Sequence, residues 1–175
     1  MKQVDLFRHT DNDGDGLTTA GVAAAERIGR EALNPPYDAF VSSGAARATQ
    51  MLEILRSAAG QNDVPITEKP GLRSSVEDRW RDAAKLAGKG ADVEQMRAVD
   101  TDLVEKESLL LGRALKQVLD DLPDGGHALV VGHSPTNEAA VLGLAAIVVP
   151  PMGKGDGLVV IDDDGRYRVE ERPNS

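Results

Sequence analysis

The sequence predicts an α/β fold, a three-layer αβα sandwich around a mostly parallel central sheet. Short apolar runs typical of strands alternate along the chain with longer segments in which apolar residues recur at helical spacing. One run, His127–Gly132, is apolar almost throughout, as in parallel strands that helices cover on both faces. The 175 residues, 41% of them hydrophobic, suffice for one sizeable core, and no repeat or linker divides them. We therefore expect a single domain over residues 1–175.

The N-terminal part is expected to contain three strands and two helices. Strands are predicted at Gln3–Phe7 and Asp38–Ser42, with a weaker one at Val64–Glu68. The first helix takes its cap from Thr18 or Thr19, because threonine oxygens accept hydrogen bonds from the free N–H groups of a helix start. It ends before Asn34-Pro35-Pro36, since proline cannot continue a helix. The second helix follows Ser42-Ser43 and ends near Gly60.

The C-terminal part begins with a polar segment. Residues 73–100 are rich in charge and are predicted to form short helices or loops outside the main layers. A longer helix starts near Thr101, with an apolar stripe on one side, and ends at Pro123. After the strand at His127–Gly132, a further helix is expected from about Thr136 to Ala146. The runs LVVID and RYRVEE, separated by the turn sequence DDG, predict a closing hairpin.

Composition excludes several classes of function. The formal net charge of −9 disfavours nucleic acid and anionic membranes as partners, because both would repel the chain. The absence of cysteine excludes disulfides, thiolate metal sites and a cysteine nucleophile. The start MKQVDLFRH lacks the apolar core of a signal peptide, and no run is long enough to cross a bilayer. We expect a soluble cytoplasmic protein, whose oligomeric state the sequence does not indicate.

Three segments that follow predicted strands carry the residues of chemical interest. They are Arg8-His9-Thr10, the segment from Ser42 to Arg47, and Gly132-His133-Ser134. In α/β folds, ligands bind beyond the carboxyl ends of the strands, so these segments are expected to meet at one edge. Arginine forks and helix N-termini both suit phosphate oxygens, which predicts a site for an anionic phosphoryl group. His127 begins its strand at the opposite end and is expected to be structural.

These segments also carry a resemblance to a known family. RHT, LTTAG, VSSGAARATQ and VVGHSP occur in the order typical of the histidine phosphatase superfamily, also called phosphoglycerate mutase-like. The resemblance runs from Gln3 to about Ala146, and its compact size is most similar to the small phosphohistidine phosphatase branch. It implies a phosphoglycerate mutase-like αβα fold. It also implies phosphatase activity on phosphohistidine proteins or small phosphorylated molecules, with no metal and no cofactor.

The resemblance assigns roles residue by residue. His9 would be the nucleophile that forms a phosphohistidine intermediate, and Arg8, Arg47 and His133 would bind the phosphoryl oxygens. Thr10 stands where the family has glycine, so its hydroxyl is expected to contact the phosphate or narrow the pocket. Ser134, directly after His133, is expected to contact the substrate as well.

The general acid is where this chain departs from the pattern. Many members carry a glutamate in a segment of the form Leu-x-Glu, and here Ser74 occupies that place. Glu77 is the candidate substitute, with Asp78 and Glu68 nearby, although all three also fit an ordinary solvated surface. Without an acid, an alkyl phosphate would lose a contribution of roughly 10²–10⁴ in rate. Phosphohistidine and aryl phosphates, whose leaving groups need less help, would then be favoured.

Four other interpretations can be compared with this one. DNDGDG has the aspartate spacing of a calcium loop, but the twelfth position, which needs a glutamate, is Val22. GHSPT resembles a serine-hydrolase elbow, but Pro135 has no N–H for an oxyanion hole. A member of the fold that binds phosphorylated ligands without turnover remains open. A mutase is disfavoured, because the phosphoglycerate mutases are considerably longer and carry the glutamate.

Overall fold

A computed structural model of the chain describes residues 1–172 and contains a six-stranded central sheet in the order β5-β4-β6-β1-β7-β8. The strands are β1 (Lys2–Arg8), β4 (Ala39–Ser42), β5 (Ile66–Glu68), β6 (His127–Gly132), β7 (Gly157–Asp163) and β8 (Arg166–Arg172). Strands β5, β4, β6 and β1 pair in parallel, and β7 and β8 add an antiparallel hairpin at one edge. The expected mostly parallel sheet and closing hairpin are confirmed.

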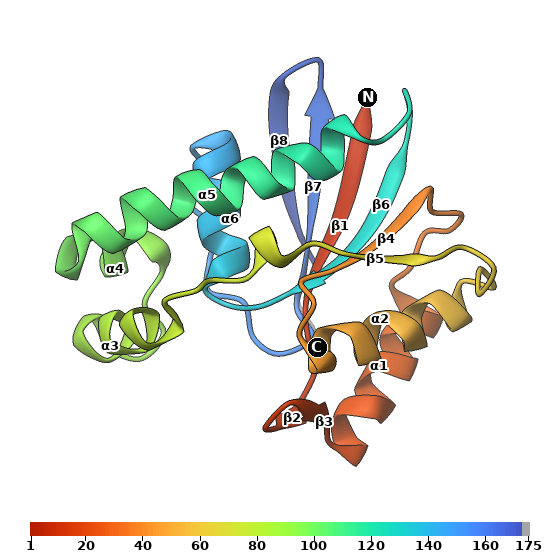
Figure 1. Ribbon diagram of the computed structural model, residues 1–175, viewed down its shortest axis with the longest axis horizontal. Coiled ribbons are helices and arrows are strands. Elements are labelled where there is room, and N and C mark those ends of the chain that lie inside the picture. The colour runs from red at the N-terminus through yellow and green to blue at the C-terminus, as the bar shows by residue number, and fades with distance from the viewer. Residues whose placement is uncertain (173–175) are drawn as a thin grey trace.

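Helices cover both faces of the sheet (Figure 1). They are α1 (Thr19–Glu31), α2 (Ala46–Ala58), α3 (Glu77–Ala87), α4 (Val93–Val99), α5 (Thr101–Asp120) and α6 (Thr136–Ala145), with a short 3₁₀ turn at Pro70–Leu72. Helices α1 and α2 pack on one face, and α5 and α6 pack on the other, so the predicted αβα layering is confirmed. None of the helices described within residues 1–172 is long and apolar enough to cross a membrane.

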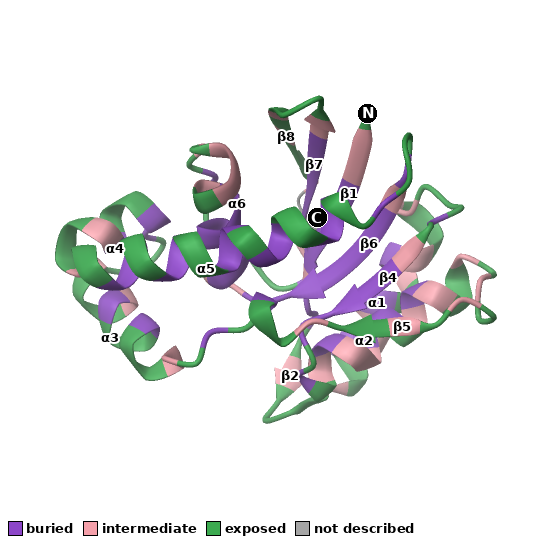
Figure 2. Cartoon of the chain, turned by 45° about the horizontal axis from the view of Figure 1, so that its top comes forward, coloured by how far each residue is buried: buried purple, intermediate pink, exposed green. Residues whose placement is uncertain are grey.

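The sheet separates two hydrophobic clusters because neighbouring residues of a strand point to opposite faces. In β1, Phe7 contributes to the cluster under α1 and α2, whereas Leu6 contributes to the cluster under α5 and α6. In β6, Leu129 and Val130 divide in the same way. Figure 2 shows the inner strands β4, β6 and β7 largely buried, whereas the edge strands β5 and β8 and the outer sides of the helices are more exposed. Burial on both faces explains why β6 is apolar almost throughout.

The entry into α1 explains the LTTAG sequence. Thr18 is the N-cap, and its Oγ1 accepts a hydrogen bond from the Gly21 N–H at 3.0 Å. Gly21 lies against the backbone of Asp11, so that a Cβ at position 21 would be 2.0 Å from the Asp11 carbonyl oxygen. Only glycine fits this contact. The helix ends at Glu31, before the two prolines, as expected.

Residues 73–100 form α3 and α4, which lie beside the end of α5 and away from the sheet (Figure 1). The expectation of short helices outside the main layers is confirmed. Although this segment is rich in charged residues, some of its side chains join the hydrophobic core. Trp80 and Ala83 of α3, with Val93 and Met96 of α4, are buried and extend the cluster under α5 and α6. This packing fixes α3 against one wall of the site.

Candidate active site

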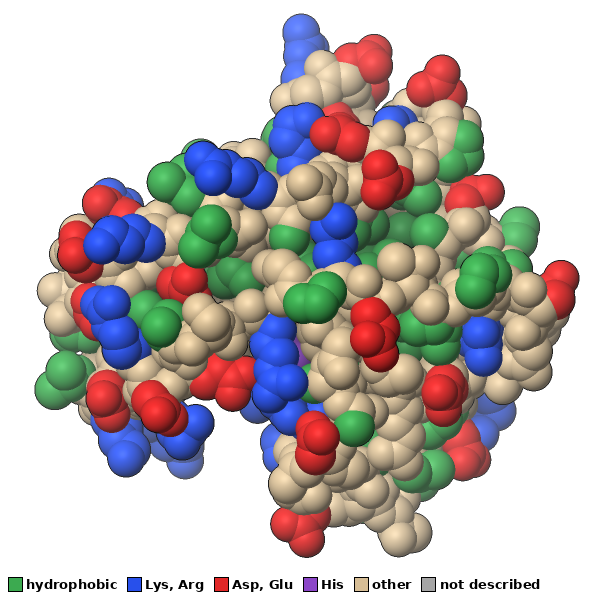
Figure 3. Space-filling view, in the orientation of Figure 1, with side chains coloured by type: hydrophobic (Ala, Val, Ile, Leu, Met, Phe, Trp, Pro, Cys, Tyr) green, Lys and Arg blue, Asp and Glu red, His purple; other side chains and the backbone are tan. Residues whose placement is uncertain are grey.

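A cleft of about 540 Å³ lies at the carboxyl ends of β1, β4 and β6, where it is bounded on one side by α3. Arg8, His9, Arg47, His133, Ser134 and Glu77 all line it, and Thr10 does not. Arg73, Arg81 and Lys154 add further positive charge to its wall. Figure 3 shows Lys and Arg side chains gathered at a hollow between the α3 region and the rest of the molecule. An acidic protein therefore has a locally basic cleft.

Strand pairing brings the two histidines together. In the parallel pair of β1 with β6, Arg8 lies opposite Gly132, so the next residues, His9 and His133, leave the sheet side by side. The His9 N–H donates to the Gly132 carbonyl at 3.2 Å. The imidazole ring centroids are 5.3 Å apart in an edge-to-face arrangement. Residues more than a hundred positions apart in the chain thus share one site because of the register of the sheet.

His9 is positioned with one ring nitrogen toward the cleft. Its Nδ1 lies 2.9 Å from the Thr10 carbonyl oxygen, an acceptor, which places the ring proton on Nδ1. Its Nε2 accepts from Arg47 Nε at 3.3 Å. Burial, with help from the charges of Arg47, Arg8 and Lys154, lowers the pKa of His9 to about 4. At neutral pH the Nε2 atom therefore carries a lone pair, as a nucleophile requires.

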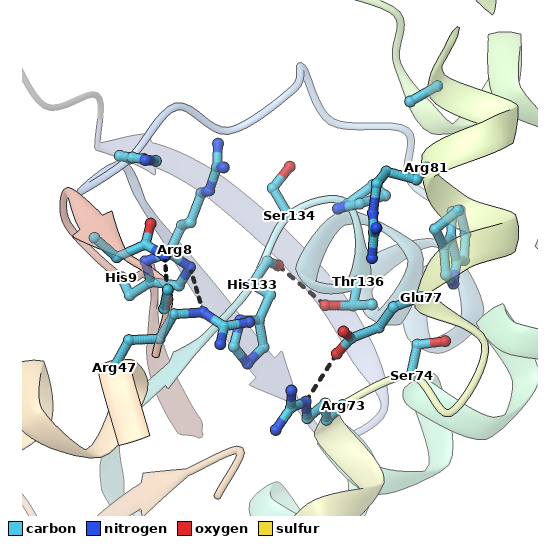
Figure 4. Close-up of a pocket in the computed structure, with 16 residues that line it drawn as sticks. Arg8, His9, Arg47, Arg73, Ser74, Glu77, Arg81, His133, Ser134 and Thr136 are labelled. Atoms are coloured by element: carbon cyan, nitrogen blue, oxygen red, sulfur yellow. Dashed lines mark hydrogen bonds and ion pairs between the residues drawn. The ribbon is translucent and has the colours of Figure 1, made fainter. Parts of the chain in front are cut away.

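His133 is the second neutral imidazole. Its Nε2 lies 2.7 Å from Ser43 Oγ, and its Nδ1 lies 3.4 Å from Arg47 Nη2. Burial, followed by the charge of Arg47, lowers its pKa to about 3. One guanidinium thus contacts both rings (Figure 4). Arg47 comes from the first turn of α2, after the turn in which Gly44 has a φ of +96°, a conformation that favours glycine.

Arg8 is held by the loop that precedes β7. Its Nη1 donates to the Met152 carbonyl at 2.8 Å, and its backbone N–H donates to the Asp156 carbonyl at 2.9 Å. The Gly155 N–H in turn donates to the Arg8 carbonyl. Burial lowers the pKa of Arg8, and the carboxylates of Glu138 and Asp156 oppose that shift. The VPPMGKGDG segment therefore anchors the guanidinium in the cleft wall.

The expected contact of the Thr10 hydroxyl with a phosphoryl group is wrong. Thr10 is buried, and its Oγ1 donates to the Gly21 carbonyl at 2.7 Å, on the side of α1. The side chain therefore joins the β1 loop to the helix start and lies outside the cleft. What Thr10 contributes to the site is its own carbonyl, which fixes the tautomer of His9.

The candidate acid Glu77 lies in the first turn of α3 and lines the cleft. Arg73 Nε donates to its Oε1 at 2.8 Å (Figure 4). Asp78 is 92% exposed and pairs with Arg81. Ser74, at the place where the family has glutamate, is hydrogen-bonded to Glu107, which also accepts from Trp80 Nε1. The role of Glu77 stays a prediction.

A buried carboxyl that the sequence analysis did not consider lies behind the cleft. Glu138 of α6 is 1% exposed and accepts a hydrogen bond from Ser134 Oγ at 2.5 Å. Burial raises its pKa to about 7. The one available signal was the only charged residue of this helix, four residues after Ser134. That spacing places both side chains on the same side of the turn.

The DNDGDG segment forms a small hairpin, β2 (Asn12–Asp13) with β3 (Gly16–Leu17), at the rim of the cleft. Two of its aspartates pair with neighbouring side chains. Asp15 accepts from Arg47 Nη1 at 3.1 Å, and Asp11 accepts from Thr18 and Lys154. No group of three or more His, Asp or Glu side chains suited to a metal ion occurs in the described part of the chain. The loop is a polar turn that orients cleft residues.

Comparisons with known proteins identify the family and the fold. The family model of the histidine phosphatase superfamily (branch 1) matches residues 3–150. No curated protein sequence matches the chain. Among solved structures, a phosphoserine phosphatase from Entamoeba histolytica superposes with a TM-score of 0.76 at 14% identity, over 98% of this chain and 97% of that one.

Two further structures have the same fold. A phosphoglycerate mutase from Bacillus anthracis str. Sterne has a TM-score of 0.69 at 15% identity, over 97% of this chain and 91% of that one. The expectation that phosphoglycerate mutases are considerably longer is wrong for this structure, because nearly all of its chain is matched. The protein histidine phosphatase SixA, complexed with tungstate, has a TM-score of 0.62 at 19% identity, over 98% of this chain and 97% of that one. At these identities the similarity concerns the phosphoglycerate mutase-like fold alone.

Proposed function

The chain belongs to the histidine phosphatase superfamily, and on that premise we propose that it is a metal-independent phosphatase with His9 as the nucleophile. The observation that carries the proposal is the state of His9. Its Nδ1 is tied to a carbonyl oxygen, and its neutral Nε2 lies beside the guanidinium of Arg47. A free lone pair next to cations that can hold phosphoryl oxygens is the arrangement that phosphoryl transfer to histidine requires.

The first chemical step transfers the phosphoryl group to His9. A bound phosphoryl group replaces His9 as the partner of Arg47, which frees Nε2 to attack phosphorus as the bond to the leaving group breaks. Arg8, Arg47 and His133 stabilise the charge on the phosphoryl oxygens. Burial and, after it, the nearby cations lower the pKa of His133, and the incoming dianion raises this pKa because it offsets the cations. Water then attacks the phosphohistidine and regenerates His9.

The proposed substrates are phosphohistidine, in a protein or peptide, and small phosphomonoesters. The basic cleft within an acidic chain supports a small anionic ligand or a phosphorylated side chain. The absence of cysteine supports a cytoplasmic setting. The alternative within the same fold is a protein that binds phosphorylated ligands without turnover. The neutral Nε2 of His9 disfavours this alternative, because binding alone needs no nucleophile. A mutase-type phosphotransferase ranks below both.

Phosphate release measured in EDTA tests the proposal. The substrates are a phosphohistidine peptide, 4-nitrophenyl phosphate and β-glycerophosphate, and the control is His9→Ala. We expect release that EDTA does not affect and that His9→Ala abolishes. Binding of inorganic phosphate without release from any of the three substrates would favour the non-catalytic alternative.

A further inference from the structure

The buried carboxyl of Glu138 has an unusual set of contacts. Its Oε2 accepts from Ser134 Oγ at 2.5 Å and from the Met152 N–H at 3.4 Å. Its Oε1 is buried and has no hydrogen-bond partner within the described residues. A carboxylate with one unpaired buried oxygen is costly to keep charged, which favours uptake of a proton. Its pKa of about 7, which results mainly from burial, is in line with that cost.

The surroundings of Glu138 contain few charges. Arg8 of β1 is the cation that acts on it, and this attraction does not offset burial. Asp156, before β7, acts on Arg8. Helix α5, which packs against α6, contributes one buried carboxyl, Glu107, which accepts hydrogen bonds from Ser74 and Trp80. Glu138 therefore exchanges a proton near neutral pH in a setting dominated by one arginine.

Ser134 connects this carboxyl with the cleft. Its side chain lines the cleft beside His133, and its hydroxyl is shared with Glu138. Figure 4 shows Ser134 between His9 on one side of the cleft and Arg81 of α3 on the other. We expect a leaving group to extend from His9 toward α3, past Ser134. A hydroxyl in this place can pass a proton inward or outward without exposing Glu138 to solvent.

We propose that Glu138 supplies, through the hydroxyl of Ser134, the proton that the leaving group takes up during phosphoryl transfer. This inference rests on the proposed phosphatase function and assigns the general acid that the sequence pattern lacks. Ser134 contacts the substrate, and Glu138 acts through Ser134. Glu77 is the weaker candidate, because it lies at the open side of the cleft in an ion pair with Arg73.

The protons balance over both half-reactions. In the first, the His9 Nε2–P bond forms, the P–O bond to the leaving group breaks, and its electron pair goes to the leaving oxygen. With Glu138 protonated at Oε2, the Ser134 oxygen accepts from that carboxyl, and the Ser134 hydroxyl turns its own proton toward the leaving oxygen. That oxygen takes the Ser134 proton, Ser134 takes the Glu138 proton, and Glu138 becomes the carboxylate that accepts from Ser134. In the second, water bonds to phosphorus as the N–P bond breaks, and a proton of the water returns through Ser134 to Glu138.

The test compares a substrate that needs a proton with one that does not. For β-glycerophosphate, Glu138→Gln and Ser134→Ala are each expected to lower kcat/KM by about 10²–10³-fold, because an alkoxide leaves poorly. For 4-nitrophenyl phosphate, both variants are expected to lose less than about tenfold, since the phenolate needs no acid. With β-glycerophosphate, the wild-type rate should fall above pH 7 as Glu138 ionises, and Glu138→Gln should lack this pH dependence.

Matched variants separate this role from a structural one. Ser134→Thr keeps the hydroxyl and should retain most of the β-glycerophosphate activity. Glu107→Gln alters the other buried serine–glutamate pair and should leave the ratio of the two substrates within about twofold. An unchanged ratio in Glu138→Gln, or a selective loss in Glu77→Gln or Glu107→Gln, would overturn the inference. Hydrolysis of 4-nitrophenyl phosphate that depends on His9 tests the phosphatase function separately, so the two ideas can fail independently.

Discussion

The two ends of the parallel strands both present histidine, and their surroundings differ in charge. At the carboxyl end, His9 and His133 lie among Arg8 and Arg47. At the amino end, His127 Nε2 lies 3.0 Å from Oδ1 of the buried Asp5. Register places these groups, because β1 and β6 run side by side in the same direction. The same residue type is therefore next to cations at one end and next to a carboxylate at the other.

The amino end is a closed hydrogen-bond network. Asp5 accepts from Tyr37 Oη at 2.9 Å and from Gln3 Nε2 at 3.0 Å, and Arg172 lies 3.6 Å away. Burial alone would raise the pKa of Asp5, but the hydrogen bonds, led by that of His127, outweigh it and lower the pKa. The partners of Asp5 named here all belong to the protein itself, so we expect this network to stabilise the fold and not to bind a ligand. His127 is structural in this arrangement, as expected from its position.

The contrast shows what makes a histidine reactive in this fold. Burial, together with the cations beside His9, holds its ring neutral and leaves Nε2 open to an incoming electrophile, whereas a carboxylate contacts the ring of His127. The carboxyl end also lies at a cleft, and the amino end is covered by Tyr37. Charge and access together, more than the residue itself, separate a candidate nucleophile from a structural group.

The largest expected effect comes from replacing His9 or His127, each in a separate variant. His9→Ala should lower phosphatase activity by about 10⁴-fold or more, since removal of a nucleophile leaves little of the reaction. His127→Gln should keep activity within about twofold but lower the free energy of unfolding by about 1–2 kcal/mol, because it weakens a buried hydrogen bond. Steady-state kinetics and urea denaturation measure both. Loss of activity in a folded His127→Gln protein would contradict the assignment of His127 to a purely structural role.

The two ends should also lose stability in different pH ranges. The folded pKa of His9 is about 4, below its ordinary 6.5, so between these values the unfolded chain binds a proton that the folded one does not. Stability should therefore fall as pH drops from 6.5, by at most about 1.4 kcal/mol per pH unit for each such histidine. Asp5 has a lowered pKa, so its contribution persists above 3.8 and disappears only at lower pH.

Urea denaturation at successive pH values checks this difference. His9→Ala should reduce the loss of stability between pH 6.5 and about 4. Of His9 and His133, only His133 then still takes up a proton on unfolding in this range. Asp5→Asn should leave that decline in place and reduce the stability near neutral pH instead. A decline in this range that is unaffected by His9→Ala would show that the histidine is not held neutral by its surroundings.

The smallest expected effect concerns the cations at the rim of the cleft. Arg73 lines the cleft, is 39% exposed and acts on His133, so Arg73→Ala should raise KM by roughly threefold at low salt and by less at high salt. Arg79, six residues later, pairs with Asp100 and does not line this cleft. Arg79→Ala is the matched control and should leave KM unchanged. Equal changes in KM for both variants would show that the effect comes from the net charge of the protein and not from the position of Arg73 in the cleft.

Much of this molecule follows from local patterns in the chain. Alternation of apolar runs with helical periodicity predicted the layers. The rule that ligands meet the carboxyl ends of parallel strands predicted that Arg8, His9, Arg47 and His133 lie together, and they line one cleft. The structure also places His127 away from them. These predictions succeed because strand direction and helix start are set by neighbouring residues, and parallel pairing then aligns the strand ends.

Side-chain directions and protonation states depended on packing between distant segments. The Thr10 hydroxyl turns toward Gly21 because α1 passes close to the loop after β1. Glu138 is buried beneath the loop that leads to β7, whose Met152 N–H donates to Oε2, while Oε1 has no partner among the described residues. Neither contact leaves a signal in local spacing. The sequence by itself determined which chemical groups share an edge, and only the tertiary structure decided which of them face the cleft and which hold a proton. Desolvation and contact depend on the whole fold, whereas periodicity depends on neighbours.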